Sequence, residues 1–201
     1  MKTTILLLAI AFVTTVAGAA ELDQAAAALA GTEATFTQHF TPKGFKTAQV
    51  ESGTVVFGNL PMMRWSYAKP EEKLFVFDGG KSWFYVPGDK QVTVTRLDAS
   101  RRAELPFLVI GDPAARAQNF VVREKTRGKS VVVTLQPRSP AAMIRNVAVT
   151  IAPATHAIER VDYTDREGNQ TTFVLSGLRK RALTDDLFHF TPPAGVQVVE
   201  Q

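Results

Sequence analysis

The sequence feature that most constrains the fold is an aromatic-rich stretch, residues 54–96. It contains both tryptophans and two of the three tyrosines of the chain. Five short apolar runs follow one another, separated by turn-forming pairs such as Gly58-Asn59 and Gly79-Gly80. Short apolar runs broken by glycine, asparagine and proline are typical of consecutive antiparallel strands. The stretch therefore predicts a β-meander.

Side-chain alternation predicts which faces of these strands are apolar. Met63, Trp65 and Tyr67 share one face of the run at residues 62–67, and polar residues occupy the other face. The next two runs, LFVF and WFYV, break this rule because large apolar side chains occupy both faces. Strands of this kind need apolar cover on each side. We expect that cover to come from a second layer, a lid or a bound molecule.

Two segments outside the meander are predicted to be helical. Residues 22–30 are rich in alanine and end at Gly31, a residue type that commonly terminates helices. Residues 99–110 follow a capping aspartate, and Pro106 divides them. The part after the proline, residues 107–110, is apolar throughout, which is more than a surface helix buries against one neighbour. This segment is either an ordinary core helix or a lid over the meander.

Strand patterns with a period of two occur on both sides of these elements. They are predicted at residues 36–40 and 46–57, with a bulge at Gly53, and again from residue 120 to a last short strand at residues 187–190. The count reaches about eleven or twelve strands with two or three short helices. No βαβ alternation, internal repeat or linker is visible. A single antiparallel, barrel-like sheet is the economical fold.

Several short motifs carry a resemblance to a known family. MRWSYAKP, VFDG and WFYVP occur in this order, and QV opens the following strand. FTQHF at residues 36–40 and FTPPAGV at residues 190–196 extend the pattern over most of the chain. The chain resembles the periplasmic outer-membrane lipoprotein carrier family (LolA). This resemblance implies a mainly β protein with short α-helices, a single incompletely closed β-barrel with a helical lid, and it favours the lid interpretation of residues 99–110.

The first 20 residues have the composition of a secretory signal peptide. Lys2 precedes an apolar run at residues 5–16, and small residues before Glu21 fit a cleavage site. A single membrane anchor is the alternative, but the run is shorter than the roughly 20 residues of a spanning helix. The chain has no cysteine, which leaves no residue for a lipid-modified N-terminus. We expect residues 21–201 to form one soluble lipoprotein-carrier-like domain in the periplasm.

Composition and motifs argue against nucleic-acid binding and against catalysis. The 23 basic and 19 acidic residues give a formal net charge of +4, which is too mild to indicate nucleic acid. Basic clusters at residues 101–102 and 179–181 are either solvated or docking sites for anionic lipid or an acidic partner. The three histidines lack metal-ligand spacing, and neither a nucleophile elbow nor a phosphate-binding loop is present. We expect no enzymatic activity, catalytic residue, metal or cofactor.

Two classes of function remain. One is a periplasmic carrier that shields the acyl chains of lipoproteins, or lipid, in a hydrophobic cavity and transfers them from the inner to the outer membrane. The other is a non-catalytic lipid-binding or envelope-sensing interaction domain of the same architecture. For a carrier, the family resemblance implies two partners, an inner-membrane lipoprotein-releasing transporter and an outer-membrane acceptor. We expect the protein to be a monomer.

The predicted ligand-binding cavity combines the meander with the lid. Core packing is the commoner role of any single aromatic residue, so the carrier hypothesis rests on the whole set rather than on one member. Alternation does not decide which strand face lines the cavity. The predicted lining residues are Met63, Trp65, Phe75, Phe77, Trp83, Tyr85, Leu105 and Leu108.

The resemblance also implies a latch on the lid. In the family, an arginine just before the proline that leads into the tryptophan strand holds the lid helices closed. Here Asn59 and Leu60 precede Pro61, and neither supplies a guanidinium. Arg64 lies on the strand face opposite the aromatic row. We assign Asn59 and Leu60, with Pro106 in the lid, to the lid and latch region, and we expect a more open lid unless packing by Leu60 compensates.

Overall fold

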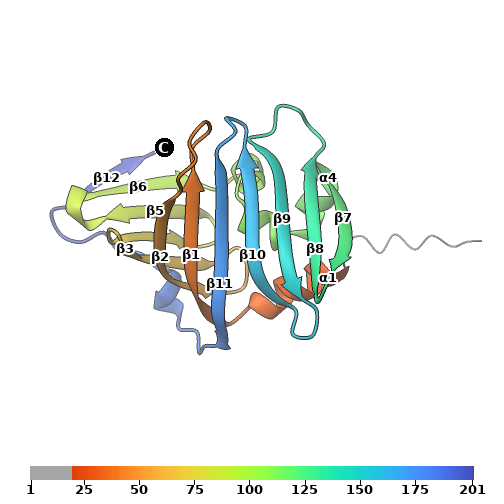
Figure 1. Cartoon of the computed structure of the whole chain (residues 1–201). Coiled ribbons are helices and arrows are strands. Elements are labelled where there is room, and N and C mark those ends of the chain that lie inside the picture. The colour runs from red at the N-terminus through yellow and green to blue at the C-terminus, as the bar shows by residue number, and fades with distance from the viewer. Residues whose placement is uncertain (1–19) are drawn as a thin grey trace, which may run out of the picture.

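The computed structural model describes residues 20–201, in which twelve strands form one curved sheet (Figure 1). The predicted signal peptide lies outside the described residues, apart from Ala20. The strands are β1 (Thr32–Thr41), β2 (Gln49–Phe57), β3 (Met63–Lys69), β4 (Lys73–Phe77), β5 (Lys81–Val86), β6 (Gln91–Arg96), β7 (Phe120–Arg127), β8 (Ser130–Pro137), β9 (Ile144–Ala152), β10 (Ala157–Asp165), β11 (Gln170–Lys180) and β12 (Gln197–Glu200).

The strand order is β12-β6-β5-β4-β3-β2-β1-β11-β10-β9-β8-β7. All neighbouring strands are antiparallel except β12, which runs parallel to β6. Within the described part of the chain, β7 and β12 form the two edges, so the sheet curves without closing. The predicted fold class is confirmed: the protein is mainly β, with one open antiparallel sheet and a few short helices.

Within residues 20–201, four short α-helices accompany the sheet: α1 (Ala20–Leu29), α2 (Ala99–Ala103), α3 (Pro106–Ile110) and α4 (Pro113–Asn119). The predicted division at Pro106 is confirmed, because this residue occupies the first position of α3. The carboxylate of Asp98 accepts a hydrogen bond from the Arg101 amide of α2, 2.8 Å away, and Asp112 caps α4 in the same way. The helices lie behind the front strands in Figure 1.

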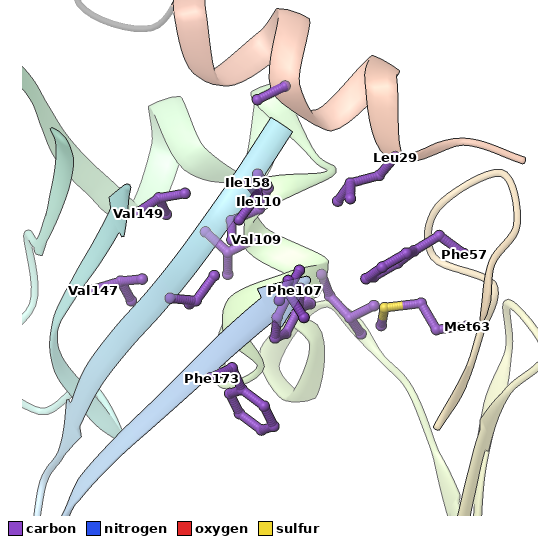
Figure 2. Packing of buried hydrophobic residues seen from close by; sticks show 14 of the residues in the cluster. Leu29, Phe57, Met63, Phe107, Val109, Ile110, Val147, Val149, Ile158 and Phe173 are labelled. Carbon is purple, nitrogen blue, oxygen red and sulfur yellow. The ribbon is translucent and has the colours of Figure 1, made fainter. Parts of the chain in front are cut away.

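The core lies between the helices and the concave face of the sheet. Leu22 and Leu29 of α1 are fully buried, and α1 contacts β9 and β10. All five residues of α3 are buried, because this helix runs through the middle of the core rather than along a surface (Figure 2). The apolar composition of residues 107–110 is therefore explained by contacts on every side of the helix.

Register shifts explain two features of the sequence pattern. The bulge predicted at Gly53 is confirmed, because the pairing of β2 with β3 shifts between Ser52 and Gly53. A Cβ atom on Gly53 would lie 1.9 Å from the carbonyl oxygen of Ser66, so only glycine fits this position. A second shift, where β9 meets the end of β10, buries Ile144 and leaves Met143 exposed, so the alternation of buried and exposed residues in β9 is interrupted at its start.

The prediction of a last strand at residues 187–190 is wrong. The chain forms a 3₁₀ helix, η2 (Asp185–Phe188), and the last strand is β12. In Figure 1 this C-terminal segment, in blue, runs from the end of β11 past the meander to β12. Phe188 is buried against Gly58, at the end of β2. The C-terminal segment therefore supplies cover for the meander instead of a further meander strand.

Candidate functional site

A cavity of about 240 Å³ lies between the concave face of the meander and the segment that enters α3. We call it the aromatic cavity. Strands β3 and β4 form one side, β10 and β11 contribute one residue each, and the start of α3 closes it. The residues that line it are Gln38, Met63, Trp65, Tyr67, Phe75, Phe77, Leu105, Pro106, Phe107, Tyr163 and Phe173.

Phe107 of α3 contacts aromatic rings on both sides of this cavity. Its ring centroid lies 4.8 Å from that of Trp65, 5.5 Å from that of Phe173 and 6.0 Å from that of Phe57. Edge-to-face pairs at such distances contribute about 0.5–1.5 kcal/mol each beyond the area they bury. Figure 2 shows Phe107 projecting from α3 toward the β-strands, with Phe173 on one side and Phe57 on the other. Phe107 therefore occupies space that any apolar ligand would need.

The structure brings five of the eight predicted ligand-binding residues to one cavity. Pro106, assigned to the lid, lines the same cavity. The predicted alternation of β3 is confirmed, since Met63, Trp65 and Tyr67 are all buried on the concave face. The binding role of these residues stays a prediction. The five are Met63, Trp65, Phe75, Phe77 and Leu105.

Trp83 and Tyr85 do not line this cavity, and their predicted position is corrected. Both project from the convex face of β5, where their ring centroids lie 5.9 and 5.6 Å from that of Phe190. The indole nitrogen of Trp83 donates a hydrogen bond to the carboxylate of Asp78, 2.9 Å away. The C-terminal segment is thus the apolar cover that the sequence of these strands requires on their second face.

The strand pairing gives the physical reason for this correction. Phe75 pairs directly with Phe84, so these two residues share the concave face, and their rings stack 4.3 Å apart. Trp83, one residue earlier, must then project from the other face. In the sequence both faces of β5 are apolar, and alternation alone does not say which one is concave.

Leu108 also lies outside the aromatic cavity. It is buried and lines a second hollow of about 120 Å³, together with Leu60 and Pro61. Successive helical residues are separated by about 100° around the axis, so Leu108 projects away from the direction of Phe107. Leu108 therefore does not line the same cavity as Met63, contrary to the prediction.

The region predicted to hold a vacant latch is filled by apolar packing. A Cβ atom placed on Gly111, which follows α3, would lie 2.5 Å from Cδ1 of Leu60, so the two residues are in close contact. Asn59 is exposed. Arg64 donates a hydrogen bond to the carbonyl of Leu187 at 3.3 Å, which ties it to the C-terminal segment and not to the lid. Leu60 is the residue of this turn that holds α3.

A guanidinium does hold α3, but it comes from a residue that sequence reasoning missed. Arg116 of α4 is 2% exposed and donates hydrogen bonds to the carbonyls of Val109 and Ile110, at the end of α3. It also forms an ion pair with Asp23 of α1. Its Nε has no hydrogen-bond partner among residues 20–201. Arg116 thus joins three helices and satisfies the carbonyl of Ile110, which the helix end leaves free; the carbonyl of Val109 also accepts a hydrogen bond from the amide of Asp112.

The two basic clusters of the sequence take part in internal contacts. Arg102 donates a hydrogen bond to the carbonyl of Gly79, which ties α2 to the turn between β4 and β5. Arg179 and Arg181 both form ion pairs with Glu33 of β1. Those hydrogen bonds and charges hold the pKa of Glu33 below its usual value. These contacts give both clusters a structural role.

Two tyrosines, Tyr67 and Tyr163, line the aromatic cavity. Burial raises the pKa of Tyr67, and the nearby carboxylate of Glu51 raises it further. Burial also raises the pKa of Tyr163, against a hydrogen bond with Thr171 that lowers it. Both side chains are therefore neutral hydrogen-bond donors at neutral pH.

These features define a class of protein: an open antiparallel sheet whose concave face holds a short, fully buried helix beside an aromatic cavity. The chain matches the family model described as "Outer membrane lipoprotein carrier protein LolA" over residues 27–191. No helix within residues 20–201 has the length and apolar character needed to cross a membrane.

Individual relatives agree with this match. An outer-membrane lipoprotein carrier protein of Xanthomonas axonopodis pv. citri is 30% identical over 182 residues, covering 89% of this chain and 86% of the relative. One from Nitrosospira multiformis is 32% identical over 170 residues, covering 84% and 81%. An uncharacterized conserved protein from Thermus thermophilus has the same fold, with a TM-score of 0.55 at 15% identity, covering 91% of this chain and 99% of its own.

The chain belongs to the outer-membrane lipoprotein carrier family. This is a family of carriers and not a class of enzymes, which agrees with the expectation from the motifs.

Proposed function

We propose that this protein shields the acyl chains of lipoproteins in the aromatic cavity and transfers them from the inner to the outer membrane. The observation that carries the proposal is the cavity itself, lined by aromatic and apolar side chains and closed by a helix that touches each side of it. Burial of an acyl chain stabilises a complex by about 0.8 kcal/mol for each methylene group. The burial of several methylene groups therefore gives enough free energy for binding without a specific polar contact.

The present size of the cavity means that α3 must move when a chain enters. A volume of about 240 Å³ is below the roughly 300–1,000 Å³ of pockets that hold drug-sized ligands. Displacement of Phe107 would open the space between Trp65 and Phe173. Loading then breaks the ring contacts of Phe107, and these contacts form again when α3 closes. The free energy of forming them again favours release of the acyl chain. Leu60 and Arg116 set the free energy of this movement.

The proposal includes a location and two partners. Residues 1–20 would direct export and be removed, leaving a periplasmic domain of residues 21–201. An inner-membrane transporter would supply the lipoprotein, and an outer-membrane acceptor would receive it. Intact-mass measurement on protein from the periplasm should give a chain that begins at Ala20 or Glu21. Protein that keeps its first 19 residues and fractionates with membranes would contradict this part of the proposal.

The aromatic cavity is tested with two matched tryptophan variants. Trp65→Ala removes a ring from the cavity, whereas Trp83→Ala removes one from the convex face of the same meander. We expect Trp65→Ala to weaken binding of a fluorescent acyl probe about tenfold or more. The substitution removes a buried aromatic ring whose contacts contribute several kcal/mol. Trp83→Ala should leave the affinity within about twofold. Equal affinities in two folded variants, or a larger loss in Trp83→Ala, would place the ligand elsewhere.

A further inference from the structure

A polar network lies along one side of the aromatic cavity. The hydroxyl of Tyr67 donates a hydrogen bond to Oε1 of Gln38 at 2.6 Å, and Nε2 of Gln38 donates a long one to Glu51 at 3.4 Å. Lys73 forms an ion pair with Glu51, and its ammonium lies 5.7 Å from the ring centroid of Tyr67. The four side chains come from β1, β3, β2 and β4, which are neighbours in the sheet.

The network sits at one end of the cavity. Gln38 pairs with Glu51 across β1 and β2, and Tyr67 pairs with Lys73 across β3 and β4. Both pairs lie close to the turns that join these strands. Gln38 and Tyr67 line the cavity, while the side chains of Glu51 and Lys73 are 19% and 21% exposed. The cavity therefore has a polar end at these turns and an apolar body that extends toward α3.

The charge of the network indicates which polar group it suits. Lys73 and Glu51 neutralise each other, so no net charge faces the cavity. A free carboxylate placed beside Gln38 would lose its hydration without gaining a free cation, because Lys73 is already paired with Glu51. A neutral carbonyl, in contrast, accepts a hydrogen bond from Nε2 of Gln38 or the hydroxyl of Tyr67. The 3.4 Å bond to Glu51 is the weak contact that such a group would replace.

We propose that Gln38 and Tyr67, supported by Glu51 and Lys73, form a subsite for the neutral carbonyl that links an acyl chain to its carrier, an amide or an ester. The inference rests on the proposed function and adds the orientation of the ligand. The hydrocarbon extends toward Phe107, and the linkage stays at the turns of β1–β2 and β3–β4. The molecule attached to the chain then remains outside the sheet.

The test uses pyrene-labelled chains of one length with four ends: a methyl amide, a methyl ester, a free acid and a plain hydrocarbon. Wild type should bind the amide or the ester more tightly than the hydrocarbon, and the free acid more weakly than either. Gln38→Leu and Tyr67→Phe should each weaken binding of the preferred carbonyl probe about three- to tenfold, the effect of one hydrogen bond. Affinity for the hydrocarbon should stay within about twofold.

Tyr85→Phe is the matched control, because it removes a hydroxyl from the same meander on the convex face, beside Phe190 and outside the cavity. It should leave the ratio of carbonyl to hydrocarbon affinity unchanged. Tighter binding of the amide indicates that the natural chain is linked through an amine. Tighter binding of the ester indicates that it is linked through glycerol. The subsite is contradicted if Gln38→Leu and Tyr67→Phe lower the affinity for all probes equally, or if neither lowers any affinity. Either result is compatible with acyl binding in the aromatic cavity. Failure of wild type to bind any probe overturns the proposed function as well.

Discussion

The concave face of the sheet is packed in two different ways. Along β8–β10 its side chains are mostly branched and aliphatic, apart from Tyr163 in the cavity: Val149, Ile151 and Val161 are fully buried, and α1 covers β9 and β10. Along β3 and β4 the corresponding side chains are aromatic or long, and a cavity remains between them and α3. We call these regions the aliphatic half and the aromatic half.

The difference follows from the shapes of the side chains. Branched aliphatic groups interdigitate at the density of an organic crystal, and a ligand would find no space among them. Rings that meet edge to face at about 5 Å leave gaps, and a ring can turn or withdraw without breaking a hydrogen bond. We therefore expect the aliphatic half to determine global stability, and the aromatic half to determine ligand affinity.

The largest expected effect lies in the aliphatic half. Ile151→Ala should lower the free energy of unfolding by about 2–5 kcal/mol, because the site is fully buried and closely packed. Phe75→Ala, at the partly exposed edge of the aromatic half, should cost less stability but more probe affinity. Denaturant unfolding and probe titration of both variants give the comparison. A greater stability loss in Phe75→Ala would reverse the roles assigned to the two halves.

Arg116 connects the two halves by holding α3 between them. Arg116→Met keeps most of the side-chain volume and removes the hydrogen bonds to Val109 and Ile110, at an expected cost of about 1.5–3 kcal/mol. Asp23 is 46% exposed and is hydrated after the change. Hydrogen exchange at residues 107–111 should accelerate on the order of tenfold or more, while exchange in β9 changes less. Equal acceleration in both would mean that Arg116 supports the whole fold and not α3 in particular.

The contact between Leu60 and Gly111 tests the apolar hold on the lid. Gly111→Ala should destabilise the protein by about 1–3 kcal/mol, because the added methyl overlaps Leu60 while the backbone, with φ of −82°, accepts alanine. In a Leu60→Ala background the same change should cost less, because the overlap with Cδ1 at 2.5 Å is removed and only the Cβ of residue 60, 2.7 Å away, remains. A double-mutant cycle by denaturant unfolding measures this coupling. Additive effects would show that Leu60 does not hold the end of α3.

The sequence predicted the aromatic half better than the elements that close it. Regular alternation in β3 placed Met63, Trp65 and Tyr67 correctly, because only one face of that strand is apolar. The two faces of β5 are equally apolar, so nothing local to the strand could separate Trp83 from Phe84. The cover that decides between them comes from the C-terminal segment, about a hundred residues further along the chain.

The hold on α3 was not visible in the sequence for a similar reason. Asp23 and Arg116 are 93 positions apart, and nothing near either residue indicates an ion pair. The family resemblance implies an arginine just before Pro61. The structure has an arginine on α4 instead. At the position before Pro61, a methyl group of Leu60 contacts Gly111. Long-range pairing of this kind depends on the folded chain and not on local pattern.

The smallest expected effect concerns pH and the convex face of the meander. Burial alone would raise the pKa of Asp78, but hydrogen bonds from Trp83 and two backbone amides bring it below the ordinary value of 3.8. A lowered pKa in the folded state adds stability above pH 3.8, and this contribution is lost as the pH falls further. Wild type should therefore lose slightly more thermal stability between pH 6 and pH 3 than Asp78→Asn. Asp89→Asn, an exposed change, serves as the control, and identical slopes in all three proteins would contradict the assignment.

The central claim is that an acyl chain lies in the aromatic half, against α3, and the most direct measurement is photocrosslinking. An acyl chain with a diazirine at its tip is bound to the wild-type protein. The complex is irradiated, and the labelled residues are identified by mass spectrometry. We expect labels on Met63, Phe75, Phe77 or Phe107, with loss of labelling when unlabelled chain competes. Labels concentrated on the aliphatic half, or on Trp83 and Phe190 of the convex face, would contradict it.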